Sequence, residues 1–135
     1  MTEHQSAQPT GVNVRRQKNT VLRILALVIL ILVVWEGLLG SALMSGPPFG
    51  HRDLGLHIAI GLLLVGLSTG SFVYTLRLPD TRRRVATGVT AAATIAATLA
   101  GLVFIIGDGS PVALWGMEYS TLFVVVAAIL VLVWG

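Results

Sequence analysis

Three ionisable residues lie within otherwise apolar stretches of the chain: Glu36, His57 and Glu118. A charged carboxylate at mid-membrane depth costs at least ~2.5 kcal/mol, so an ionisable residue inside such a stretch is by default a candidate for a functional site. An imidazole can bind a metal ion or carry a proton near neutral pH, and a carboxylate can pair with it. The three residues therefore predict one polar site that binds a cofactor or moves protons.

The composition indicates that these stretches lie in lipid. Of the 135 residues, 55% are hydrophobic and only 11% are charged, and the mean hydropathy is +0.87. A soluble domain carries roughly a quarter charged residues, so the apolar side chains must face something other than water. The absence of cysteine excludes disulfides, thiolate metal sites and covalently attached haem. Any metal would be held by histidine, carboxylate or methionine.

Four apolar runs separated by short, turn-like breaks predict an all-α fold, a polytopic four-helix antiparallel transmembrane bundle. Each run reaches the length of about 20 residues that a helix needs to cross a membrane. The expected helices cover residues 24–45, 54–76, 85–107 and 112–134. Residues 1–20 are polar and lack an apolar period, so we expect a disordered, flexible cytoplasmic tail before a transmembrane domain of residues 21–135.

The first apolar run has a second interpretation, a cleaved signal peptide. A basic segment precedes the run, and Gly40, Ser41 and Ala42 have the small side chains of a cleavage site. The run is longer than the apolar region of an ordinary signal peptide, which favours a spanning helix.

Eight of the nine basic residues fall on one side of the expected bundle. They precede or open the first helix, or flank the break between the second and third: Arg15, Arg16, Lys18, Arg23, Arg77, Arg82, Arg83 and Arg84. Arg52 alone falls on the other side. Because basic loops stay in the cytoplasm, both termini should be cytoplasmic, with the protein in the plasma membrane. Basic residues at helix ends suit contact with anionic lipid headgroups, and we expect no nucleic-acid binding.

Small residues predict which helix faces meet. In the third helix they recur every four positions: Gly88, Ala92, Ala96 and Ala100. This spacing lets helix backbones approach closely, so we expect the third helix at the centre of the bundle and expect Ala96→Leu to destabilise it. The inward face of the second helix carries small and polar residues at helical spacing: His57, Gly61, Leu64, Ser68 and Phe72.

The three ionisable residues fall in the outer half of the bundle. At a rise of about 1.5 Å per residue, Glu36, Glu118 and His57 lie roughly 13, 9 and 5 Å from the outer ends of their helices. We therefore expect the three to converge, with His57 and at least one carboxylate facing the same interhelical space. Further candidate ligands at or above this level are Met44, Met117 and, in a loop, His51. Methionines at such positions more often fill gaps in packing than bind a metal.

The stretch WEGLLGSALMSGPPFGHRDLGLHIAIGLLL, residues 35–64, places a carboxylate and glycines in one helix, then a Gly/Pro loop, then a His-xxx-Gly start to the next helix. It resembles one half of the four-helix haem-binding membrane proteins, the type of haem A synthase and small b-type cytochromes. The resemblance implies a b-type haem with His57 as axial metal ligand and Glu36 as companion carboxylate. The chain departs from that family because Glu118 stands where a histidine is expected. The second axial ligand would then be His51, Met44, Met117 or the His57 of a second copy.

Three functions are compatible with these residues. The first is a haem- or quinone-linked redox or electron-transfer protein built around the polar site. The second is a non-catalytic accessory subunit, packed as a homo-oligomer or in a larger membrane complex with its carboxylates bonded to the partner. The third is a small transporter or proton relay, although the expected helices are not broken as in transporters. No nucleotide-binding, zinc-hydrolase or nucleophile motif occurs, so we do not expect catalysis by this chain alone.

Overall fold

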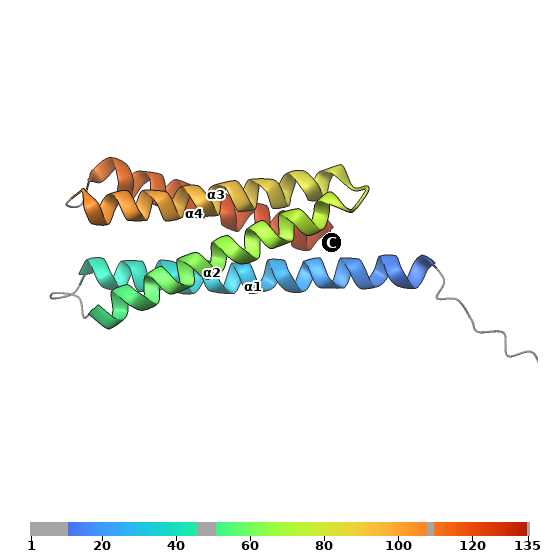
Figure 1. Cartoon of the computed structure of the whole chain (residues 1–135), viewed down its shortest axis with the longest axis horizontal. Helices are drawn as coiled ribbons and strands as arrows, with labels where there is room; N and C mark the ends of the chain where they lie inside the picture. The colour runs from blue at the N-terminus through green and yellow to red at the C-terminus, as the bar shows by residue number, and fades with distance from the viewer. Residues whose placement is uncertain (1–10, 46–50, 108–109, 135) are drawn as a thin grey trace, which may run out of the picture.

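The structure is a computed structural model that describes residues 11–45, 51–107 and 110–134, with side chains described for residues 19–41, 54–107 and 110–134. Four helices account for nearly all of this part of the chain (Figure 1). They are α1 (Gly11–Ser45), α2 (His51–Leu76), α3 (Thr81–Ile106) and α4 (Pro111–Trp134). The predicted all-α fold is confirmed.

All four helices can cross a membrane. Their apolar spans are Asn19–Ser41, Leu54–Leu76, Thr81–Ile106 and Pro111–Trp134, of 23, 23, 26 and 24 residues. A span of about 20 helical residues is enough to cross the hydrocarbon core. The chain is therefore a small, multi-pass integral membrane protein.

Several helices begin earlier than the apolar pattern predicts. The helix α1 already begins at Gly11, within the segment predicted to be flexible, whereas residues 1–10 lie outside the described part, so the flexible tail stays a prediction. Adding residues to an existing helix is far easier than nucleating a new one, so a proline-free polar segment can extend a spanning helix. For the same reason His51 belongs to the first turn of α2 rather than to a loop.

The start of α3 has a specific cause. Asp80 caps the helix, and its side chain accepts hydrogen bonds from the backbone N–H groups of Arg82 and Arg83, at 3.0 and 3.4 Å. Such a cap satisfies backbone donors that the first turn leaves free. The helix therefore begins at Thr81 and includes the arginine run.

The helices form a ring in which the backbone of each lies close to those of its two neighbours, whereas the diagonal pairs α1/α3 and α2/α4 meet only through side chains. Figure 1 shows α3 and α4 running alongside each other, while α2 crosses obliquely from α1 toward α3. We call the end that carries the α2–α3 connection the arginine end and the opposite end the distal end. No helix occupies the centre of the ring, so the expected central position of the third helix is wrong.

The predicted small-residue stripe of α3 is right only in part, because Gly88 packs against Phe72 of α2 and Ala100 against Gly116 of α4. Ala92 and Ala96 are exposed, and the buried residues of α3 are Ala86, Thr87, Thr90, Ala91 and Thr94. Because an α-helix has 3.6 residues per turn, positions four residues apart drift around the helix by about 40° at each step. A stripe stays on one face only when spacings of three and four alternate.

Alternating spacings of three and four mark the inward stripes of the other helices. Along α1 the buried positions are Leu22, Ala26, Ile29 and Val33. Along α2 they are Leu64, Ser68, Ser71 and Thr75, which confirms most of the predicted inward face but replaces Phe72 by Ser71; Leu78, in the turn after α2, is also buried. Along α4 they are Val124, Ala127, Ala128 and Val131, with Ala113 buried near the start of the helix. This is the pattern of helices that pack side by side in a bundle.

The core is concentrated toward the arginine end. One buried cluster contains Leu22, Ala26, Leu78, Ala86 and Val131, and a second, nearer mid-bundle, contains Ile29, Val33, Leu64 and Val124. Across residues 34–41, 54–63, 95–107 and 110–123, only Ala113 is buried. The α3–α4 pair stands apart from α1 at the distal end in Figure 1. The distal half is therefore the less tightly packed half.

Hydroxyl groups and arginines hold the arginine end together. The hydroxyls of Thr75 and Thr87 are hydrogen-bonded at 2.7 Å, which joins α2 to α3. Arg83 hydrogen-bonds Asn19 of α1 and the carbonyl of Trp134 at the end of α4, and its Nε lies 3.0 Å from the carboxylate of Asp80. Arg83 thus ties three helices together, a role beyond the predicted one of setting orientation.

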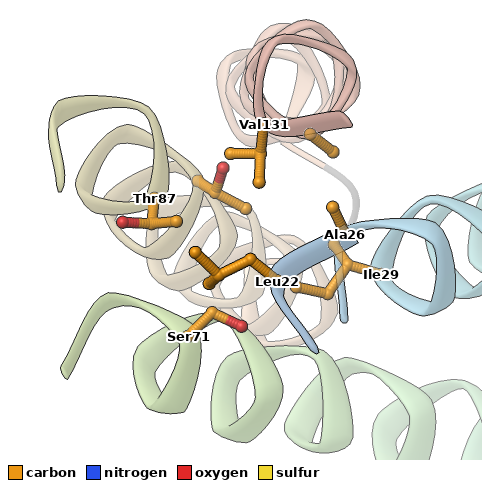
Figure 2. A pocket seen from close by; sticks show the side chains of 8 residues that line it. Leu22, Ala26, Ile29, Ser71, Thr87 and Val131 are labelled. Atoms are coloured by element: carbon orange, nitrogen blue, oxygen red, sulfur yellow. The ribbon is translucent and has the colours of Figure 1, made fainter. Parts of the chain in front are cut away.

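A small cavity of about 10 Å³ lies where all four helices meet (Figure 2). It is lined by Leu22, Ala26, Ile29, Ser71, Thr87, Thr90, Ala128 and Val131. Space of this size holds at most about one water molecule. It is a packing defect of the arginine half and not a ligand site.

Candidate functional site: a histidine–glutamate pair

Glu36 and His57 form an ion-pair contact between α1 and α2. The His57 Nδ1 atom lies 3.0 Å from Glu36 Oε1, and the two side chains are 18% and 20% exposed. The predicted meeting of His57 with a carboxylate in one interhelical space is confirmed, with Glu36 as the carboxylate.

The register of the two helices explains why these side chains meet. Glu36 lies three residues beyond Val33 and so continues the inward stripe of α1. His57 precedes Leu64 by one heptad and so continues the inward stripe of α2. Stripes with this spacing face the partner helix along their whole length, so the two polar residues are presented to each other rather than to lipid.

Two glycines make room for the pair. A Cβ atom on Gly61 of α2 would lie 3.5 Å from Glu36 Oε1, and one on Gly40 of α1 would lie 3.6 Å from His57 Cε1. Each polar side chain therefore packs against a glycine of the opposite helix. Small residues at such positions allow membrane helices to approach closely, and a larger side chain at either glycine would push the pair apart.

The pair retains unused hydrogen-bonding capacity. Glu36 Oε2 is a buried atom with no hydrogen-bond partner, and the His57 Nδ1 contact lacks the alignment of a hydrogen bond. His57 Nε2 has no partner among the described side chains. A carboxylate beside an imidazole orients the ring and stabilises a proton on it. The arrangement can accept a hydrogen bond, present a ring nitrogen to a ligand and exchange a proton with it.

An apolar layer closes the site on the side of the arginine end. Ile29, Val33, Leu64 and Val124 form this layer, and the buried hydroxyls of Ser68 and Ser71 lie beyond it. The neighbouring distal segments contain hardly any buried residue. Access to the pair is therefore from the distal half of the bundle.

Glu118 does not join the pair. It is exposed on α4, a helix whose backbone does not come close to that of α2. Its neighbour Met117 packs toward α3, where a Cβ atom on Gly101 would lie 3.5 Å from the Met117 sulfur. Since Val124 is buried and Met117 precedes it by one heptad, Glu118 falls one position off the inward stripe. Within the described part of the chain, no three histidine or carboxylate side chains lie close enough to hold a metal ion.

The remaining candidates are placed only in part. Met44 and His51 lie in α1 and α2, but their side chains are outside the described residues, so their proposed ligand roles stay predictions. Trp35 is 55% exposed, and Trp115 stacks on Tyr119 with ring centroids 5.7 Å apart.

Two functional features were missed at the level of sequence. Gly40 leaves room for the His57 ring, and Arg83 joins three helices. The spacing of three and four residues from Val33 through Glu36 to Gly40 would have placed Gly40 on the inward stripe of α1 and so indicated its contact with His57. Nothing in the arginine run distinguishes Arg83 from its neighbours.

Comparison of the chain with protein-family models, with curated proteins and with solved structures gave no match.

Proposed function

We propose that this membrane protein is a quinone-linked redox protein and that the Glu36–His57 pair binds the quinone head group. The observation that supports this proposal is the 3.0 Å contact between the two side chains, with an unpartnered carboxylate oxygen beside it. Quinones dissolve in the bilayer and reach a site through its lipid-facing side. A mostly buried polar pair with access from the loosely packed distal half suits such a ligand.

The chemistry of the pair matches what a quinone needs. Reduction to the quinol adds two electrons and two protons, one proton to each carbonyl oxygen. The ring N–H of His57 donates a hydrogen bond to one carbonyl oxygen and can deliver its proton there. The Glu36 carboxylate stabilises the proton that stays on the other ring nitrogen, and water at the open side of the site supplies the second proton to the far carbonyl oxygen and reprotonates His57. The electrons come from a redox partner outside this chain.

The orientation of the protein belongs to the same proposal. Arg77, Arg82, Arg83 and Arg84 lie at the arginine end, which the positive-inside rule assigns to the cytoplasm. Both termini are then cytoplasmic in the plasma membrane, and the pair opens toward the outer leaflet. The chain contains no cysteine, so Ser110→Cys provides a unique label. A membrane-impermeant thiol reagent should label it from outside the cell, and labelling from the cytoplasmic side alone would contradict the orientation.

A haem b is the second form of the proposal. His57 Nε2 is free to serve as one axial ligand, and a bound haem would supply one-electron transfer. A second axial ligand is missing among the described side chains, because Met117 packs toward Gly101 of α3. Among the described side chains only His57 offers an axial ligand, so a haem ligated on both sides would need Met44, His51 or the His57 of a second copy, whereas a quinone needs no second ligand. The quinone is therefore the favoured ligand.

A transporter or transmembrane proton relay is less well supported. Such a protein needs a polar path from one side of the membrane to the other. The apolar layer of Ile29, Val33, Leu64 and Val124 lies between the pair and the hydroxyl groups of the arginine half. The geometry supports a site open to one half of the membrane.

Binding of a short-chain quinone to the protein in lipid nanodiscs tests the proposal. Losing a hydrogen bond to a charged group costs about 1.5–3 kcal/mol, so Glu36→Gln and His57→Ala should each weaken binding roughly ten- to a hundred-fold. Glu118→Gln is the matched control, because it changes the same kind of residue on the exposed face of α4. Its affinity should equal that of the wild type.

Two results would contradict the proposal. One is wild-type protein that does not bind the quinone at micromolar concentrations, and the other is binding that is unchanged in both pair variants. An absorption spectrum of the same samples distinguishes quinone from haem as the bound ligand. A Soret band that disappears in His57→Ala would identify haem as the ligand in place of quinone.

A further inference from the structure

α1 extends beyond its membrane span at the arginine end. The apolar span begins at Asn19, whereas the helix itself begins at Gly11. The eight residues before Asn19 add about 12 Å to the helix at the usual rise, and Figure 1 shows α1 running past the ends of the other helices. The headgroup layer on each side of a bilayer is about 5–8 Å thick. The first two turns of α1 therefore pass through the headgroup layer.

These two turns are basic. They contain Arg15, Arg16 and Lys18 and no aspartate or glutamate. All three basic residues lie within about 6 Å of Asn19 along the helix axis. Their position on the helix therefore places three positive charges at the depth of the lipid phosphates.

Three exposed arginines lie at the same end of the bundle. Arg23 is four residues inside the span of α1, Arg77 follows the last residue of α2, and Arg82 is the second residue of α3. Their guanidinium groups form no hydrogen bond or ion pair within the described part of the chain. Arg83 and Arg84 differ, because both donate hydrogen bonds to other parts of the chain. The exposed arginines can therefore bind a group outside the protein.

Little negative charge offsets these residues. Among the described side chains at the arginine end, Asp80 is the only carboxylate, and it caps α3 and lies 3.0 Å from Arg83 Nε. A charged side chain inside an apolar span is costly unless it reaches the interface, and arginine does so by extending its long stem along the helix. Arg23 is in this position. The arginine end therefore presents an excess of positive charge at the membrane boundary.

We propose that the arginine end binds anionic phospholipids through their headgroup phosphates. The residues that hold the phosphates are called the basic collar: Arg15, Arg16, Lys18, Arg23, Arg77 and Arg82. Clusters of about four to eight basic residues beside a membrane span attract anionic lipids, and a guanidinium group can bind a phosphate through two hydrogen bonds. A lipid is favoured over a soluble anion, because the collar lies at the depth of the headgroups. This inference does not depend on the quinone proposal, since the Glu36–His57 pair opens to the distal half.

Spin-labelled lipids test the lipid preference directly. Electron paramagnetic resonance would compare how strongly wild-type protein in phosphatidylcholine vesicles immobilises labelled phosphatidylglycerol and labelled phosphatidylcholine. Phosphatidylglycerol should be preferred roughly fivefold or more at low salt, because each basic residue near an anionic surface favours binding by about that factor. The preference should fall as added salt screens the charges. Equal immobilisation of the two lipids at low salt would overturn the proposal.

Glutamine substitutions test the exposed arginines of the collar. The triple variant Arg23→Gln, Arg77→Gln and Arg82→Gln should lower the preference for phosphatidylglycerol at least about threefold. Arg52→Gln is the control, because it removes an arginine of the distal end that Asp53 follows in the sequence. Its lipid preference should equal that of the wild type. An unchanged preference in the triple variant, or an equal loss in the control, would overturn the proposal.

The extension of α1 is tested in the same way. The triple variant Arg15→Gln, Arg16→Gln and Lys18→Gln should also lower the preference at least about threefold, and a wild-type preference in this variant would contradict the collar. Inorganic phosphate at constant ionic strength should not displace labelled phosphatidylglycerol from the wild-type protein. Displacement by millimolar phosphate would identify a soluble anion as the ligand and overturn the proposal.

Discussion

At the scale of single residues, Glu36 and His57 depend on each other. Each lies on the inward stripe of its helix, is about four-fifths buried, and has the other as its nearest polar partner at 3.0 Å. Removing one member leaves a polar group without compensation at a membrane depth where water is scarce. Two independent polar residues would not behave in this way.

A double-mutant cycle measures this dependence. Glu36→Leu and His57→Leu should each destabilise the bundle, and the double variant should be less destabilised than the sum of the two. We expect a coupling free energy of about 1–3 kcal/mol, the range for residues in direct contact. Unfolding in mixed detergent micelles gives the three free energies, and simple additivity would show that the pair is not coupled.

A second prediction concerns Gly61, which leaves room for the Glu36 side chain. Gly61→Leu should force the pair apart and destabilise the bundle by about 1–3 kcal/mol, because a Cβ atom there already contacts Glu36. Gly66→Leu is the matched control, since a Cβ atom at Gly66 meets nothing within 4 Å. Quinone binding and detergent stability should both fall in the first variant. Equal effects of the two substitutions would show that the small size of Gly61 is not what allows Glu36 to reach His57.

At the scale of the elements, the helix ends are held by different means. The distal half of the bundle has few buried residues, whereas the arginine end is tied by side chains that cross between helices. Arg83 reaches Asn19 on α1 and the last turn of α4. The arginine end should therefore be the more rigid half, and the distal half the one that opens to ligands.

Arg83 and Arg82 can be compared directly. Arg83→Gln should cost about 1–3 kcal/mol of unfolding free energy, because it removes two hydrogen bonds between helices, each worth about 0.5–1.5 kcal/mol. Arg82→Gln should change stability by less than about 0.5 kcal/mol, as is usual for an exposed side chain. Thermal unfolding in detergent measures both. Similar losses in the two variants would show that net charge matters rather than the contacts of Arg83.

A further prediction concerns the face of α3 that is buried in the structure, which includes Ala91 and not Ala96. Ala91 is 6% exposed, so Ala91→Leu should overpack the bundle and cost about 1–3 kcal/mol. Ala96 is exposed, so Ala96→Leu should be tolerated, contrary to what its place in the four-residue repeat suggests. The same unfolding measurement distinguishes them. Destabilisation by Ala96→Leu alone would mean that the repeat, and not the alternating spacing, marks the packed face.

At the scale of the whole molecule, hydropathy was enough to predict four spanning helices, because each apolar run is long and the breaks are short. Helix starts were less predictable, since polar residues such as 11–20 extend a helix without any apolar period. The meeting of Glu36 with His57 followed from the cost of isolated polar groups in lipid. The separation of Glu118 did not, because depth along the membrane says nothing about which way a helix is rotated.

The central claim, that the Glu36–His57 pair exchanges a proton with a bound quinone, is tested most directly by infrared difference spectroscopy. Protein in quinone-containing vesicles would be cycled between the oxidised and reduced states of the quinone. The account predicts a carboxyl band that changes on reduction, disappears in Glu36→Gln and persists in Glu118→Gln. A carboxyl signal that is absent in the wild type, or that survives in Glu36→Gln, would contradict it.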